Sequence, residues 1–105
     1  MKLRTLTAPE ASALVDELRA MADLPPGANP DALRRAKEIR FQLQSQADTT
    51  PSAQARADEV YRQLEVLLHA HRWKAEPSLE YFRKQIKSSC ERLRVHLGLK
   101  SRPSA

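Results

Sequence analysis

Prolines and capping residues divide this sequence of 105 residues into four segments, and this feature restricts the fold more than any other. Proline lacks a backbone N–H and restricts the residue before it, so it favours the first turn of a helix and interrupts a helix elsewhere. Thr7 and Glu10 match a capping box, and Pro30 and Pro51 each follow a residue that caps helices well. Between the breaks, apolar residues recur at a spacing of three or four. The expected helices span residues 8–22, 30–47, 51–74 and 78–97, followed by a polar tail at 99–105.

The short breaks predict how these helices pack. A connection of a few residues places consecutive helices side by side in opposite directions. A chain of 105 residues has the length of one domain. The sequence therefore predicts an all-α single domain over residues 1–105, an up-down antiparallel four-helix bundle with short loops. Gly98 followed by Leu99 predicts that the fourth helix ends in a Schellman motif.

Each expected helix has one apolar stripe, which we assign to the core. His71 and Cys90 fall on the third and fourth stripes, so we expect both side chains to be packed, not reactive. Phe41 lies off the second stripe. The central stripe residues are Leu14, Leu18 and Met21, then Ala36, Ile39 and Leu43, then Val60, Leu64 and Leu67, and last Leu79, Ile86 and Leu93.

Composition excludes several functional classes. Two glycines are too few for a phosphate-binding loop, and no apolar run approaches the length of about 20 residues that spans a membrane. The first residues lack the apolar stretch of a signal peptide, and a single cysteine leaves no internal disulfide. We therefore expect a cytoplasmic protein with no membrane span, no cofactor, no metal and no small-molecule substrate. The excess of 12 arginines over 6 lysines, with abundant alanine and leucine, is typical of a GC-rich bacterial sequence.

The positive charge is concentrated near the C-terminal end. Net charge is +5, yet residues 71–105 carry nine basic residues against three acidic ones. Arg83, Lys87 and Arg94 fall within about 40° of one another on a helical wheel, and Lys84 flanks them. Together with Arg72 and Lys74, these six residues are the predicted binding site for nucleic acid or an acidic protein. The alternative is a basic face that is merely solvated.

A second set of residues is apolar but lies off the core stripes. Val66 and Trp73 are seven apart on the third expected helix, and Tyr81 follows across a short turn. Tryptophan is a favoured interface anchor, so these three residues are the predicted interface with a macromolecular partner or a second copy of the chain. In the alternative interpretation, Trp73 covers the open end of the bundle.

Arg62 and His69, seven residues apart, share a face of the third expected helix. An arginine followed by a histidine at this spacing in an all-helical chain resembles the active-site pattern of HEPN-type ribonucleases. In that family the pair assembles across a dimer to cut RNA. The resemblance covers two residues, and the alternative is a solvated polar face. His69 and His71 point to different sides of a helix, so they cannot bind one metal ion together.

Residues 77–87 resemble the recognition helix of AraC-type helix-turn-helix domains. The shared features are a serine, then Tyr-Phe, then a basic residue, an apolar residue and a lysine. The resemblance implies a helix that reads the major groove of DNA. The sequence departs from the pattern at Ala75, where a turn glycine is expected, and at Glu76, where an apolar residue should pack. These departures favour a basic amphipathic helix.

These features predict a small, non-catalytic bacterial interaction module, which could be an adaptor, a regulator or an inhibitor. It would dock a basic and apolar helical face on a macromolecular partner. The alternative is a nucleic-acid-binding helical subunit that uses the basic face of the C-terminal helix. A HEPN-like ribonuclease is the third alternative.

Overall fold

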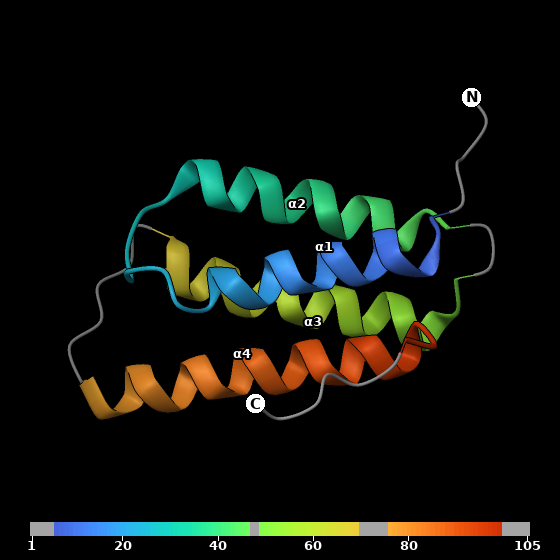
Figure 1. Ribbon diagram of the computed structural model, residues 1–105. Helices are drawn as coiled ribbons and strands as arrows, with labels where there is room; N and C mark the ends of the chain where they lie inside the picture. The colour runs from blue at the N-terminus through green and yellow to red at the C-terminus, as the bar shows by residue number, and fades with distance from the viewer. Residues whose placement is uncertain (1–5, 47–48, 70–75, 100–105) are drawn as a thin grey trace.

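The computed structural model describes residues 6–46, 49–69 and 76–99, and these residues form four α-helices without any strand. Consecutive helices run in opposite directions (Figure 1). Helix α1 packs against α2 and α4, and α3 packs against the same two helices. The predicted all-α four-helix bundle is confirmed. The helices are α1 (Ala8–Met21), α2 (Pro30–Gln44), α3 (Pro51–Leu68) and α4 (Glu76–His96).

The predicted capping residues begin the first three helices. The Thr7 hydroxyl accepts a hydrogen bond from the Glu10 N–H at 3.2 Å, and the Glu10 carboxylate accepts from the Thr7 N–H at 2.9 Å. Asn29 caps α2 and Thr50 caps α3 in the same way, each through its side-chain oxygen. These bonds satisfy amides that have no partner inside a helix.

Helix α4 ends in the Schellman motif that the sequence predicts. Gly98 adopts a φ of 75°, which only glycine takes without strain. The Leu99 N–H donates to the Arg94 carbonyl at 2.8 Å, and the Gly98 N–H donates to the Val95 carbonyl at 3.0 Å. Leu99 folds back against the core, as this motif requires.

Helix α3 ends at Leu68, so the expectation that it continues to residue 74 is wrong. The loop between α1 and α2 reaches the end of α3 and donates two backbone hydrogen bonds to it. The Gly27 N–H bonds the Leu67 carbonyl at 2.9 Å, and the Asn29 N–H bonds the Leu68 carbonyl at 2.8 Å. These amides replace the donors that a continuing helix would supply, and His69 turns to an extended conformation. The longest helix is consequently α4, with 21 residues, whereas the sequence pattern had indicated the third helix.

The apolar stripes meet in one core, as predicted. Every central stripe residue named above is buried, and Cys90 lies among them with no exposed surface. Phe41 is exposed, which confirms its position off the second stripe. His71, which we expect to be packed, and Trp73 of the predicted interface lie outside the described residues.

Arginines join neighbouring helices around this core. Each of the following pairs with a carboxylate on a neighbouring helix, which satisfies both charges at the edge of the apolar interior. Arg35 of α2 holds Glu17 of α1, with one of its two bonds at 3.0 Å. Arg40 of α2 pairs with Asp58 of α3 at 2.9 Å, and Arg92 of α4 with Glu59 of α3 at 3.6 Å.

Candidate functional site

The predicted basic stripe on α4 lies along its boundary with α1, where Arg94 is buried and Arg83 and Lys87 are partly covered. Arg94 is only 5% exposed, and its guanidinium donates to Asp16 at 3.2 Å and to Ser12 at 2.9 Å. Lys87 pairs with Asp23 at 2.8 Å. These contacts place the two cations against carboxylates of α1 and of the turn that follows it.

Arg83 of α4 also contacts the α1 side of the bundle. Its guanidinium donates to the Leu24 carbonyl at 2.9 Å, in the turn that follows α1. The expectation that Arg83, Lys87 and Arg94 form an open surface for phosphates is therefore wrong for Arg94, which is buried. The other two are partly covered and already hold a partner. A buried arginine whose guanidinium is bonded within the chain cannot reach an external ligand, and its removal would leave a partner carboxylate without that contact.

Sequence reasoning missed the carboxylates that receive this stripe, which lie on α1 and in the turn after it. Asp16 and Asp23 are seven residues apart, and so are their partners Arg94 and Lys87. Where two neighbouring segments run in opposite directions, two cations and two carboxylates with the same spacing can form two ion pairs. That match was visible in the sequence and was the signal that could have predicted the contact.

The remaining residues of the predicted binding site are divided between the outer side of α4 and the undescribed part of the chain. Lys84 is exposed on α4 and, among the described residues, has no ion-pair partner. Arg72 and Lys74 lie outside the described residues, as does Trp73 of the predicted interface. Lys84 is therefore the one member of the set that the structure describes as exposed and unpaired.

The side of α4 that points away from the bundle has a mixed composition. We call it the outer face of α4 and define it by Tyr81, Lys84, Ser88, Glu91, Arg92 and Val95. Tyr81 and Val95 are 66% and 61% exposed, at the two ends of this face. Ser88 lies midway between them and is exposed. Three residues at a spacing of seven thus form the centre line of the face.

Val66 lies on the neighbouring helix α3 and is also exposed. Glu59, seven residues earlier, lies on the same side of α3 and pairs with Arg92 of α4. The exposed side of Val66 is therefore turned toward the α4 edge of the bundle. Of the predicted interface, the structure describes Val66 and Tyr81 and leaves both accessible.

The two residues that resemble a HEPN pattern are separated by the end of α3. Arg62 is exposed and its Nε donates to Asp58 at 2.6 Å, which lowers the pKa of that carboxyl. His69 is the C-cap residue, with an extended backbone. The assumption that both residues share one helical face is wrong, because the helix ends between them.

The packing of α3 and α4 also differs from a helix-turn-helix. In that motif the two helices cross at roughly 90–120°. Here α4 lies alongside α3 in the opposite direction (Figure 1). The segment that resembles a recognition helix is one side of a bundle, and its Phe82 packs against the core.

Cys90 is a buried thiol. Burial raises its pKa to about 12, and this effect exceeds those of the nearby charged groups, of which Arg19 is the largest. A thiol in this state is neutral and poorly nucleophilic at physiological pH. The prediction that Cys90 is packed is confirmed.

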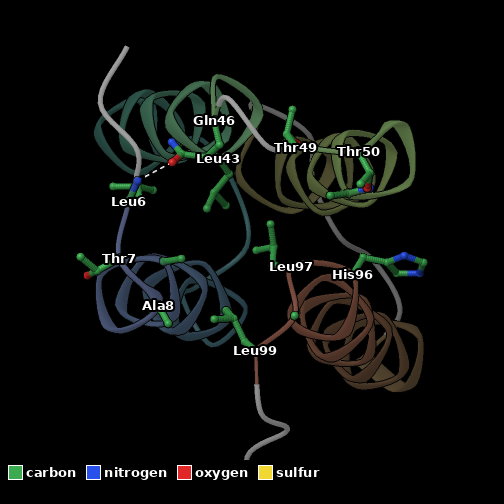
Figure 2. Close-up of a pocket in the computed structure, with 13 residues that line it drawn as sticks. Leu6, Thr7, Ala8, Leu43, Gln46, Thr49, Thr50, His96, Leu97 and Leu99 are labelled. Carbon is green, nitrogen blue, oxygen red and sulfur yellow. Dashed lines mark hydrogen bonds between the residues drawn. The ribbon is translucent and has the colours of Figure 1, made fainter. Parts of the chain in front are cut away.

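One end of the bundle encloses a cavity of about 230 Å³. It lies where the first turns of α1 and α3 meet the last turns of α2 and α4 (Figure 2). Leu43 and Leu97 point into this space, whereas the His96 ring points away from it. The Leu6 N–H donates to the Gln46 side chain at its rim. Polar and apolar side chains line this space in similar measure, and its one imidazole does not face it.

The described residues offer neither a metal-binding cluster nor a membrane-spanning helix. No cluster of three or more His, Cys, Asp or Glu side chains is close enough there to bind a metal ion. None of the described helices combines the length and the hydropathy of a membrane span.

Comparison with known proteins adds no relative to this description. No protein family model, no curated protein and no solved structure matches the chain.

Proposed function

We propose that this chain is a small, non-catalytic interaction module that docks on a protein partner through the outer face of α4. The observation that carries the proposal is the composition of that face. Tyr81 and Val95 are largely exposed, and the lysine between them, Lys84, has no ion-pair partner in the described chain. Single exposed apolar residues are common, but here two share one helical face with unpaired charges. Tyrosine is also among the residues that contribute most to binding energy.

The mixed charge of the face favours a protein over a nucleic acid. Binding to a phosphate backbone relies on several aligned cations. On the outer face, Arg92 is shared with Glu59 of α3, and Glu91 contributes a negative charge. The three cations of the predicted stripe already hold partners on α1 and in the turn after it. Nucleic-acid binding by this helix remains the alternative, with Lys84 as its described contact.

The non-catalytic part of the proposal rests on the state of the candidate reactive groups. Cys90 is buried with a raised pKa, and Arg62 is held by Asp58. The His96 ring points away from the end cavity (Figure 2). Catalysis requires a nucleophile or base to converge with its partners, and these groups lie apart.

Site-specific photo-crosslinking in the native host tests the docking surface. A benzophenone amino acid replaces Tyr81, and in a matched control it replaces Phe41 of α2, which is equally exposed at 66%. We expect protein adducts at position 81 that Ser88→Glu removes, and no such adducts at position 41. Absence of any adduct at position 81, or equal adducts at both positions, would overturn the proposal.

A salt titration tests the nucleic-acid alternative. Wild type, Lys84→Gln and the control Lys37→Gln on α2 are titrated with duplex DNA, single-stranded DNA and RNA. Replacement of one phosphate-contacting lysine lowers the slope of log affinity against log salt by about one. Such a change for Lys84→Gln alone would support the alternative and contradict docking on a protein. We expect binding too weak to show a difference between the variants.

A further inference from the structure

We infer that the outer face of α4 binds a second copy of itself, in antiparallel orientation, around a two-fold axis at Ser88. This inference rests on the proposed function and names the partner of the same face. A two-fold interface needs a surface that is complementary to itself when turned end over end. On the outer face of α4, the apolar residues, the charged residues and the central Ser88 are each arranged in this way.

The apolar residues are placed symmetrically about Ser88. In an antiparallel pair with its axis at residue 88, a residue n positions before Ser88 meets the residue n positions after it on the second copy. Tyr81 lies seven positions before and Val95 seven positions after. Each tyrosine would therefore cover the valine of the other copy, and two exposed apolar side chains per chain would be buried together.

The charges on one flank of the face complement each other in the same arrangement. Lys84 lies four positions before Ser88 and Glu91 three positions after it, and about 20° separates them around the helix. A two-fold axis perpendicular to the helices keeps this flank against the same flank of the second copy. Lys84 of each copy then meets Glu91 of the other, which gives two equivalent ion pairs.

Within one chain these two residues do not satisfy each other. Seven residues correspond to about 10 Å along a helix, too far for an ion pair. Glu91 is half-buried, and its Oε2 is buried without a hydrogen bond from the described residues. Because Oε2 is covered by the chain itself, a second copy can approach this carboxylate only through Oε1, which is not among the buried unpaired atoms. An ammonium group at Oε1 would still offset part of the cost of a partly desolvated carboxylate. The unpaired Lys84 of a second copy has the charge and the length to do so.

Ser88 allows the two helices to approach. It is exposed and small, and it is the residue that meets its own equivalent on the axis. A larger side chain at this point would separate the helices at their closest contact. The other flank carries Gln85 and Arg92, which are compatible as a hydrogen-bonded pair, although Arg92 already contacts Glu59.

The size of this contact predicts a weak dimer. The distance from Tyr81 to Val95 along the helix is about 21 Å. A single pair of helices in contact over that length is at the lower end of specific interfaces, which bury about 1,200 Å² or less in transient complexes. We expect a dissociation constant in the micromolar range, on the order of 10–100 μM.

The test is sedimentation of the purified chain over about 1 to 500 μM, which spans the expected dissociation constant. Lys84→Glu and Glu91→Lys each place like charges opposite each other twice, and each should raise the dissociation constant at least about tenfold. The double variant Lys84→Glu/Glu91→Lys restores opposite charges and should return it close to the wild-type value. Lys37→Glu on α2 makes the same charge change elsewhere and should have no effect. Circular dichroism confirms that each variant is folded.

Oxidation of a second variant tests the position of the axis. Ser88→Cys places two thiols together across the axis, within the short range that a disulfide requires. We expect it to form a covalent dimer, whereas Ser52→Cys, an exposed serine on α3, should not. Cys90 is buried and should not contribute.

Three outcomes would overturn the inference: a monomer at every concentration, a dimer that neither single charge variant weakens, or weakening without rescue in the double variant. A monomer whose position 81 still crosslinks to a different protein in cells would remove this inference and keep the proposed function. A monomer with no adduct at position 81 would remove both.

Discussion

The buried contact between Arg94 of α4 and Asp16 of α1 predicts that Arg94 stabilises the fold and does not serve binding. The perturbation is Arg94→Ala, with Lys87→Ala as the matched control. Arg94 connects α4 to α1 through Asp16, and Lys87 connects α4 to the turn after α1 through Asp23. They differ in exposure, because the Arg94 side chain is 7% exposed and that of Lys87 is 34% exposed, beside an Asp23 that is 63% exposed.

The expected magnitudes follow from this difference. Loss of one partner from a fully buried ion pair costs about 3–5 kcal/mol. Asp16 keeps 30% of its side-chain surface exposed, so water compensates part of the loss, and we expect about 2–3 kcal/mol. The exposed Lys87–Asp23 pair should contribute less than about 1 kcal/mol. A chain of this length has a free energy of unfolding of about 5–15 kcal/mol, so both variants should remain folded.

Urea denaturation followed by circular dichroism measures both free energies of unfolding. Arg94→Ala should lower the midpoint temperature by about 10–20 °C in a parallel thermal scan. Arg94→Lys should lie between wild type and Arg94→Ala, because an ammonium group cannot hold Asp16 and Ser12 as a planar guanidinium does. A double-mutant cycle with Asp16→Ala isolates the pair itself.

Equal effects of Arg94→Ala and Lys87→Ala would refute the reasoning, as would a change for Arg94→Ala below about 1 kcal/mol. If Arg94→Ala kept wild-type stability but bound a nucleic acid more weakly, Arg94 would be an exposed contact residue. The helical wheel of α4 alone indicates that exposed position.

Three further predictions address other parts of the chain. Cys90 should react with a thiol reagent only as urea unfolds the protein, and rapid labelling of the native state would contradict its burial and raised pKa. Gly27→Ala should destabilise by at least about 1 kcal/mol, because the φ of 117° at this position is strained for any side chain, and an unchanged urea midpoint would argue against the observed loop. Hydrogen bonds from arginines lower the pKa of both Glu17 and Asp58 in the folded protein, so their stabilisation is complete above the ordinary carboxyl pKa of about 4 and is lost as pH falls through the lower folded value. The free energy of unfolding should therefore decline from pH 5 downward, and a Glu17→Gln/Asp58→Asn variant should show a shallower decline.

The sequence by itself determined where the first three helices begin and which side of each helix is apolar, whereas α4 begins at Glu76, two residues before the expected start. Thr7, Pro30 and Pro51 act on the helical turn beside them, and Gly98 acts on the turn before it. These interactions are local, so they form in the same way whatever packs nearby. The spacing of apolar residues within each helix likewise predicted the core and the exposure of Phe41 and Tyr81.

Only the tertiary structure decided where α3 ends and which side of α4 meets α1. The α3 carbonyls of Leu67 and Leu68 accept from Gly27 and Asn29, about 40 residues earlier in the chain, and no pattern within α3 contains that information. A helical wheel shows Arg94 beside the apolar stripe of α4, but both flanks of that stripe are equivalent until neighbouring helices are placed. The packing of α1 against one flank buried Arg94, partly covered the rest of the predicted basic stripe and left the other side of α4 exposed. The physical reason is that a charged side chain is accessible to a partner only where no other element of the fold covers it.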